Sequence, residues 1–174
     1  MIETRESLSK LVKNNDLKTN DVITIIDGIL SALEPYHSSG LIHGNVNPES
    51  VLVSNNFKDI QLIPNFNLKS NEHLNQEYLL MYHSPEQIRK EIGPLTITTD
   101  CYSVGLIFYE LLTKKPVIKK SVLHQMRYSQ VTERPKILYE EYNQISKELS
   151  NFIMNCIAKN PNDRPKSAIE MRKK

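Results

Sequence analysis

Apolar positions recur at helical spacing through the first third of the chain. The stretch "ESLSKLV" places Leu8, Leu11 and Val12 on one helical face, and the Asn and Asp residues after it supply turn and capping groups. The stretch "VITIIDGILSALEPYH" then repeats Val, Ile and Leu at the same spacing over 22–33. This pattern predicts helices over about 6–38, with the second helix in the core because so much of its surface is apolar.

Between residues 41 and 63 the pattern changes to short β-branched runs. Two such runs, 51–53 and 60–63, are divided by Asn55 and Asn56, which predicts a small β-hairpin over 50–63. The next stretch, "PNFNLKSNEHLNQEYLLMYHSPEQ", has no sustained period and is typical of a long ordered loop. Loops of this length in compact domains usually carry a function or descend from one that did.

The remainder of the chain, from about 99 to 174, is helical in pattern. The stretch "TDCYSVGLIFYELL" is apolar nearly all round, which predicts a buried helix with Thr99 or Asp100 at its N-terminus. Amphipathic segments follow at "SVLHQMRY", "ISKELSNFIMNCIAK" and "SAIEMRKK", and the prolines of "NPNDRP" separate the last two. No linker divides the chain. We therefore predict one domain over 1–174, mainly α with a small β-hairpin.

Composition and charge restrict the classes of possible partner more than they restrict the fold. The 174 residues carry a net charge of +2, are 7% aromatic and include no Trp. These values argue against nucleic acid and membrane as partners. The longest apolar run, "VGLIFY", is too short to span a bilayer, and residues 1–20 do not resemble a signal peptide. We expect a cytoplasmic protein whose Cys101 and Cys156 are buried reduced thiols.

Five stretches, taken in order, give the chain a family likeness. They are "LIHGNVNPESVLV", "LIPNFNL", "YHSPEQ", "TTDCYSVGLIFYELLTKKP" and "NPNDRP". The chain resembles the C-terminal lobe of the eukaryotic-type protein kinases, in the Ser/Thr-like branch, over almost its whole length. The stretches are similar to the catalytic loop, the metal-binding D-F-G, the A-P-E segment, the buried helix after it and the turn with a late arginine. The resemblance implies a catalytic-loop equivalent at 41–50, an activation-segment equivalent at 65–86 and a helical subdomain at 99–174.

The positions that carry the reaction in that family hold neutral side chains here. By resemblance, Asn45 stands at the catalytic carboxylate and Asn47 at the catalytic-loop lysine, while Ser50 and Asn65 stand at the two metal ligands. Phosphoryl transfer depends on metal ions and positioned charges, and an amide cannot act as a base at ordinary pH. The resemblance therefore implies that no catalytic or metal-binding residue is intact, and we do not expect an active enzyme.

Half of a kinase nucleotide site is also absent from this sequence. The family holds the ATP phosphates with a Gly-rich loop and a strand lysine of the N-terminal lobe, and neither pattern occurs here. We expect that lobe not to be encoded by this chain. Leu52 is the equivalent of the residue beneath the adenine. We expect no cofactor, with ATP and Mg²⁺ binding only if an N-terminal lobe comes from elsewhere.

The residues that support the catalytic loop in the family are retained. The resemblance implies that His43 holds the loop, Phe66 packs below it, Asp100 anchors its backbone, and Glu86 and Arg164 form a buried ion pair. Architectural residues persist where the ionic catalysts do not. The sequence therefore favours a maintained fold without a maintained reaction.

Other histidines and hydroxyl residues lack a supporting pattern. No metal-ligand spacing includes four of the histidines, which we interpret as incidental: His37, His73, His83 and His124. Four hydroxyl residues lie in or near the activation-segment equivalent: Ser70, Tyr78, Tyr82 and Ser84. Gly44 replaces the arginine that reads a phosphate in many kinases, so we do not expect a phosphorylation switch there.

Two functions from different classes remain open. The first is a catalytically inactive, pseudokinase-like lobe that acts as a protein-binding, scaffolding or allosteric regulatory module. Another protein, or a missing N-terminal kinase lobe, would cover its apolar face around Leu52, Phe66 and the first helix. The second is a fragment or split subunit of a Ser/Thr protein kinase, which keeps weak ATP binding or phosphotransfer when joined to an N-terminal lobe.

Overall fold

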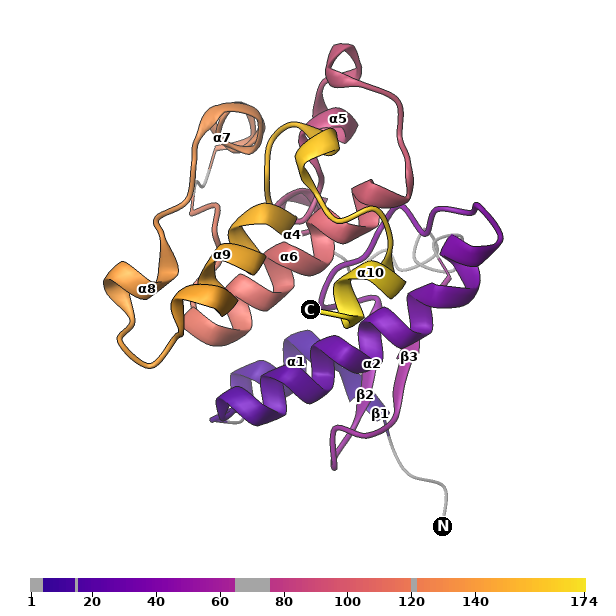
Figure 1. Ribbon diagram of the computed structural model, residues 1–174, viewed down its shortest axis with the longest axis vertical. Coiled ribbons are helices and arrows are strands. Elements are labelled where there is room, and N and C mark those ends of the chain that lie inside the picture. The colour runs from indigo at the N-terminus through magenta and orange to yellow at the C-terminus, as the bar shows by residue number, and fades with distance from the viewer. Residues whose placement is uncertain (1–4, 15, 65–75, 120–121) are drawn as a thin grey trace.

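Two long helices, α2 (Thr19–Ser38) and α6 (Ile97–Thr113), carry the core of the fold. The computed structural model describes residues 5–14, 16–64, 76–119 and 122–174. Within it, α2 packs against α6, the small sheet and the C-terminal helix (Figure 1). The apolar positions of α2 at 22–33 that were predicted to face the core are buried, and α6 is buried continuously from Thr98 to Tyr109. The predicted mainly α fold is confirmed.

Local hydrogen bonds set where these two helices begin and end. The Lys18 backbone N–H donates to the Asp21 carboxylate at 2.9 Å and caps the start of α2. In α6 the Thr96 N–H donates to the Thr99 hydroxyl at 3.2 Å. Thr96 is therefore the capping residue, and α6 begins before the predicted Thr99 or Asp100. The helix ends at Thr113, and the capping residue Lys114 adopts a left-handed conformation with φ of 57°.

A three-stranded antiparallel sheet lies beside α2, with the order β1-β2-β3. The predicted hairpin is the pair β2 (Val51–Ser54) and β3 (Ile60–Leu62), in which Val53 lies opposite Ile60. The third strand, β1 (Arg5–Ser7), was predicted as helix from about residue 6, and that prediction is wrong. Pairing with the free edge of β2 decides its conformation, because three residues have too little helical propensity to oppose it. The first helix, α1 (Leu8–Asn14), begins directly afterwards.

The segment predicted as one long loop contains short helices in its described part. These are α4 (Gln76–Leu80), α5 (Pro85–Ile88) and the 3₁₀ turn η1 (Lys90–Ile92). In α5 the Ser84 N–H donates to the Gln87 side chain at 2.9 Å, and Pro85 opens the helix. Helices this short have no sustained apolar period, which is why the pattern favoured a loop.

The C-terminal part is a set of helices around α6. They are α7 (Leu123–Thr132), α8 (Leu138–Glu141), α9 (Lys147–Cys156), the 3₁₀ turn η2 (Pro161–Asp163) and α10 (Ala168–Arg172). Helix α9 packs on α6, α10 packs on α2, and α7 lies against α5. Cys101 and Cys156 are both buried and free. Within the described ranges, none of the helices combines the length and the hydropathy that crossing a bilayer requires.

The contact between α6 and α9 depends on a glycine and gives a first testable prediction. A Cβ atom on Gly105 would lie 2.7 Å from the Cys156 Cβ and 2.8 Å from the Ile157 Cγ2. Alanine improves helix propensity, but here it overpacks a rigid contact, so we expect Gly105→Ala to lower the free energy of unfolding by about 1–3 kcal/mol. Urea denaturation measures this change. Ser31→Ala, at an exposed position of α2, is the control and should be neutral or slightly stabilising. An unchanged midpoint for Gly105→Ala would contradict the close packing.

Candidate functional site

The segment 41–50 joins α2 to β2, and the buried Asp100 of α6 holds its backbone. The Asp100 Oδ2 atom accepts a hydrogen bond from the His43 N–H at 2.8 Å, and the Oδ1 atom accepts one from the Gly44 N–H at 2.8 Å. Asp100 has no exposed surface. Two peptide groups are thus fixed by one carboxylate, at strengths above those of neutral hydrogen bonds because the acceptor is charged.

His37 completes this network, and its interpretation as an incidental histidine is wrong. The His37 Nδ1 atom accepts a hydrogen bond from the Ala168 N–H at 3.0 Å, so its Nε2 atom carries the proton. That Nε2–H donates to the Asp100 Oδ2 atom at 3.1 Å. One buried imidazole therefore ties α2 to α6 and to the start of α10. No motif marked it, because its partners lie 63 and 131 residues away along the chain.

His43 and Gly44 connect the same segment to two further parts of the molecule. The His43 Nε2–H donates to the Ile63 carbonyl at 2.8 Å, just after β3. The Gln87 side chain of α5 donates to the Gly44 carbonyl at 2.8 Å, a contact that the sequence did not indicate. Gly44 has a φ of 72°, a conformation in which glycine is favoured over other residues. The segment is therefore held from α6, β3 and α5 together.

Asn45, Asn47 and Ser50, which the resemblance places at catalytic positions, form hydrogen bonds with one another. The Asn47 Nδ2 group donates to the Asn45 carbonyl at 2.8 Å and to the Asn45 side-chain oxygen at 3.0 Å. The Asn47 Oδ1 atom accepts the N–H groups of Glu49 at 2.9 Å and Ser50 at 3.1 Å. The Ser50 hydroxyl donates to the Asn47 carbonyl at 2.9 Å. Asn47 and Ser50 have no exposed surface, so their polar groups face the loop itself.

Of the other predicted site residues, one lies on a strand and two lie outside the described residues. Leu52, the adenine-floor equivalent, is half-buried on the central strand. Asn65, the D-F-G metal-ligand equivalent, and Phe66 lie outside the described residues. Among the residues that the structure describes, no three His, Cys, Asp or Glu side chains are close enough together to hold a metal ion.

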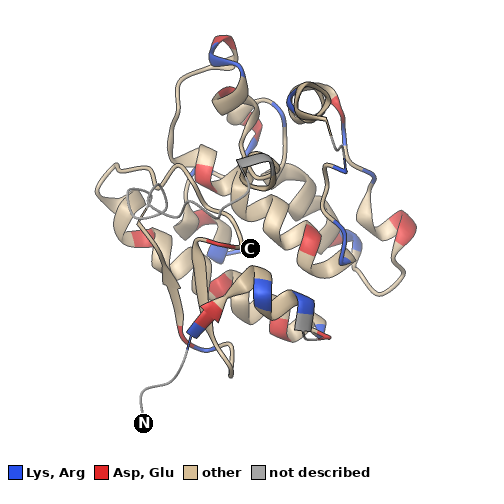
Figure 2. Ribbon diagram, turned by 180° about the vertical axis from the view of Figure 1, so that it is seen from behind, with Lys and Arg blue, Asp and Glu red and all other residues tan. Residues whose placement is uncertain are grey.

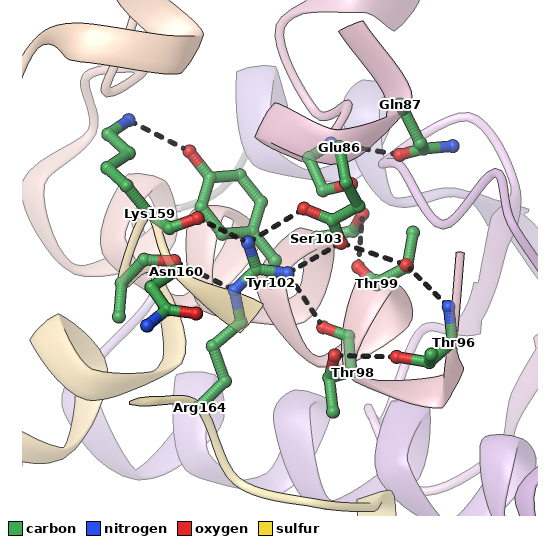
Figure 3. Close-up of polar contacts among 12 residues, drawn as sticks. Glu86, Gln87, Thr96, Thr98, Thr99, Tyr102, Ser103, Lys159, Asn160 and Arg164 are labelled. Carbon is green, nitrogen blue, oxygen red and sulfur yellow. Dashed lines mark hydrogen bonds and ion pairs between the residues drawn. The ribbon is translucent and has the colours of Figure 1, made fainter. Parts of the chain in front are cut away.

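Glu86 and Arg164 form a buried ion pair against the first turn of α6 (Figure 3). The two guanidinium NH groups donate to the two carboxylate oxygens at 2.7 and 2.9 Å, and the Thr99 hydroxyl donates to the same carboxylate at 2.9 Å. Burial alone would raise the pKa of Glu86, but the hydrogen bonds and charge of Arg164 hold it below its ordinary value. The pair joins α5, α6 and the turn after η2.

A second cation shares the aromatic ring beside Arg164. The Arg164 guanidinium lies 4.6 Å from the centre of the Tyr102 ring, and the Lys159 Nζ atom lies 5.6 Å from it. Lys159 donates to the Tyr102 hydroxyl at 3.1 Å and to the Gln130 carbonyl at 2.8 Å. Burial, and then the charge of Arg164, lower the pKa of Lys159 to about 8. Figure 3 shows both cations directed at this tyrosine.

The tyrosines of the activation-segment equivalent are partly or fully buried. The Tyr82 hydroxyl donates to the Glu110 carboxylate and lies 3.2 Å from the Tyr78 hydroxyl. Burial raises the pKa of Tyr78 to about 12 and raises the pKa of Glu110 above its ordinary value. Tyr82 is 2% exposed, so in this conformation its hydroxyl is buried and contacts Glu110 rather than solvent.

Comparison with known proteins agrees with the family resemblance seen in the sequence. A family model described as "Protein kinase domain" matches residues 1–173. The serine/threonine-protein kinase PknB of Mycolicibacterium smegmatis is 29% identical over 159 residues, which cover 86% of this chain and 25% of the relative. A probable serine/threonine-protein kinase of Streptomyces coelicolor, SCO3848, is 28% identical over 152 residues, covering 83% of this chain and 22% of the relative. The chain thus spans about a quarter of the length of these relatives.

Proposed function

This chain belongs to the protein kinase domain family, and from that premise we propose that it is a catalytically inactive, pseudokinase-like lobe. Its role would be to bind another protein, as a scaffold or an allosteric regulator, rather than to transfer phosphate. The observation that carries this proposal is the set of hydrogen bonds within the catalytic-loop equivalent, where Asn47 and Ser50 are fully buried and bond each other.

The chemistry of these positions argues against phosphoryl transfer. Asn45 has no ionisable group to accept a proton, and the Asn47 amide nitrogen already donates to Asn45. Ser50 offers one hydroxyl, which is used by the Asn47 backbone. A hard cation such as Mg²⁺ favours carboxylate and phosphate oxygens, and neutral buried donors do not replace that charge.

The supporting residues favour a binding role over simple loss of the fold. Asp100, His37 and the Glu86–Arg164 pair together hold the loop, α5 and the C-terminal turn in place. The partner that we propose is another protein, or an N-terminal kinase lobe, lying over the face around the half-buried Leu52. The competing function is a fragment of a Ser/Thr protein kinase that keeps weak nucleotide binding.

Thermal unfolding in the presence of ATP and Mg²⁺ separates these two functions. A ligand at about 100 times its Kd adds about 2.7 kcal/mol of stability, which is several degrees in Tm for a chain of this size. We expect ATP with Mg²⁺ to leave the Tm of this chain unchanged. An active Ser/Thr kinase domain is the positive control. A reproducible shift that requires Mg²⁺ would contradict the proposal and favour the kinase fragment.

A further inference from the structure

A cavity of about 380 Å³ lies on the side of the molecule opposite the sheet, between the connectors that flank α7 and the end of α8. One wall is the connector 115–119 after α6, and the other is the connector 133–136 after α7. The volume is within the range of small-ligand sites, which is roughly 300–1,000 Å³. No part of the catalytic-loop equivalent lines it.

Four cations from the two connectors line this cavity: Lys115, Lys119, Arg134 and Lys136. Figure 2 shows basic positions gathered along these connectors, next to the acidic end of α8. Two acids also line the cavity: Glu141 pairs with Lys136, and Glu133 makes an interaction of its own. For Lys115, Lys119 and Arg134, no acidic partner is found within the described ranges. With four cations and two acids, the lining keeps a net positive charge, which favours an anionic ligand.

Phenol groups add neutral donors to the cations. Tyr109 and Tyr142 line the cavity, and Tyr109 is largely buried. Burial, with the neighbouring Tyr142 and Glu141, raises the pKa of the Tyr109 phenol, so it keeps its proton at neutral pH. An anion in the cavity could therefore receive hydrogen bonds from hydroxyl, ammonium and guanidinium groups.

The walls of the cavity are held in place by the local backbone. Pro116 and Pro135 restrict the two connectors, and the Thr113 hydroxyl bonds both the N–H of Lys115 at 3.2 Å and its carbonyl at 2.9 Å. Pro116, Pro135 and Val117 also give the cavity apolar surface beside its charges. A free inorganic anion has no apolar part to pack there, whereas a peptide does.

We propose that this cavity binds a phosphoserine or phosphothreonine side chain of a partner protein. A phosphate monoester carries close to two negative charges and three acceptor oxygens, which matches several cations around one cavity better than a single carboxylate does. The net charge of the whole chain is only +2, so there is no extended field for a duplex or a lipid surface. That the phosphate comes from a protein rests on the proposed binding function, whereas the anion site itself does not.

Nuclear magnetic resonance titration of the full chain tests this proposal. The probe is a capped alanine–glycine peptide with one central phosphoserine, compared with the same peptide carrying serine and with inorganic phosphate, all in dilute chloride buffer. We expect the phosphopeptide to shift the amide signals of 115–119 and 133–142. In Lys119→Gln/Arg134→Gln the affinity should fall by about tenfold or more, because two charge-assisted contacts are removed.

A matched variant separates the cavity from general charge. Lys58→Gln/Lys173→Gln removes the same two charges from exposed positions elsewhere, and its affinity should stay within about twofold of that of the parent chain. Equal losses in both variants would reduce the effect to long-range charge and overturn the site. Equal binding of the serine peptide would overturn the phosphate assignment, and equal affinity for inorganic phosphate would assign the cavity to a free anion instead. The amide spectra also report whether each variant is folded. None of these outcomes depends on whether the chain binds ATP.

Discussion

Replacing Arg164 by methionine is expected to lower the free energy of unfolding by about 3–5 kcal/mol, the largest effect of any single substitution considered for this protein. The substitution leaves the Glu86 carboxylate buried without its cation. It also removes donors from the carbonyls of Ala158 at 2.8 Å, Lys159 at 3.1 Å and Thr98 at 3.3 Å. Since single domains are stable by about 5–15 kcal/mol in total, much of the margin would be lost. Urea denaturation followed by circular dichroism measures the change.

Arg172 provides a matched control for this experiment. It bonds the Asp27 carboxylate at 2.8 and 3.2 Å and the Glu34 carboxylate at 2.8 Å, but at an exposed site. Solvent and salt screen exposed pairs, so Arg172→Met should change the midpoint far less than Arg164→Met does. Similar losses in the two variants would show that burial does not govern the effect.

The contribution of the Glu86–Arg164 pair to stability should decrease as the pH falls. The pKa of Glu86 is lower in the folded chain than in the unfolded chain, so the unfolded chain takes up its proton first as the pH falls. The stabilisation is therefore complete above the ordinary carboxyl range and is lost as the pH falls through the folded pKa. The difference between the parent chain and Arg164→Met should shrink over that range.

Asp100→Asn is expected to lower the free energy of unfolding by about 2–4 kcal/mol, because an amide presents one acceptor oxygen where the carboxylate presents two. Three donors converge on Asp100: the N–H groups of His43 and Gly44, and the His37 imidazole. In the variant at least one donor loses its partner in a buried setting. Urea denaturation gives the global effect, and hydrogen exchange at the His43 and Gly44 amides gives the local one.

The exposed Asp163 supplies the control for that substitution. Asp163→Asn makes the same chemical change on the surface in η2, and should alter neither stability nor the exchange of the His43 and Gly44 amides. If Asp100→Asn were also neutral, the carboxylate could not be what anchors the loop.

The sequence predicted the elements whose own residues determine them. Apolar spacing predicted α2 and α6 because each buries enough Val, Ile and Leu surface to decide its conformation. Strand β1 was missed because its Arg, Glu and Ser residues have no apolar alternation, and its conformation depends on β2, about 46 residues later in the chain. The short helices α4, α5 and α8 were missed for a related reason, since four or five residues cannot show a period.

The residues of the candidate site were likewise predictable only in part. Family motifs directed attention to Asp100, Glu86 and Arg164, and these residues lie in the buried hydrogen-bond networks described above. His37 belongs to no motif that we recognised, and Gln87 lies in "YHSPEQ" without a predicted role; only the tertiary fold brings them to the loop. The cavity between the connectors could not be predicted either, because its cations come from two segments, 115–119 and 133–136, that only the tertiary fold brings together.

Under the proposed inactive role, the hydrogen bonds among Asn45, Asn47 and Ser50 would make a catalytic loop difficult to rebuild by single substitutions. A lysine at position 47 would bring a charge to a site with no exposed surface and would remove the amide that holds Glu49 and Ser50. An asparagine at position 50 would place a larger side chain at a site with no exposed surface, and would lose the hydroxyl bonded to Asn47. We therefore expect each of these substitutions on its own to lower the free energy of unfolding. The three residues therefore restrict which single replacements this loop can tolerate.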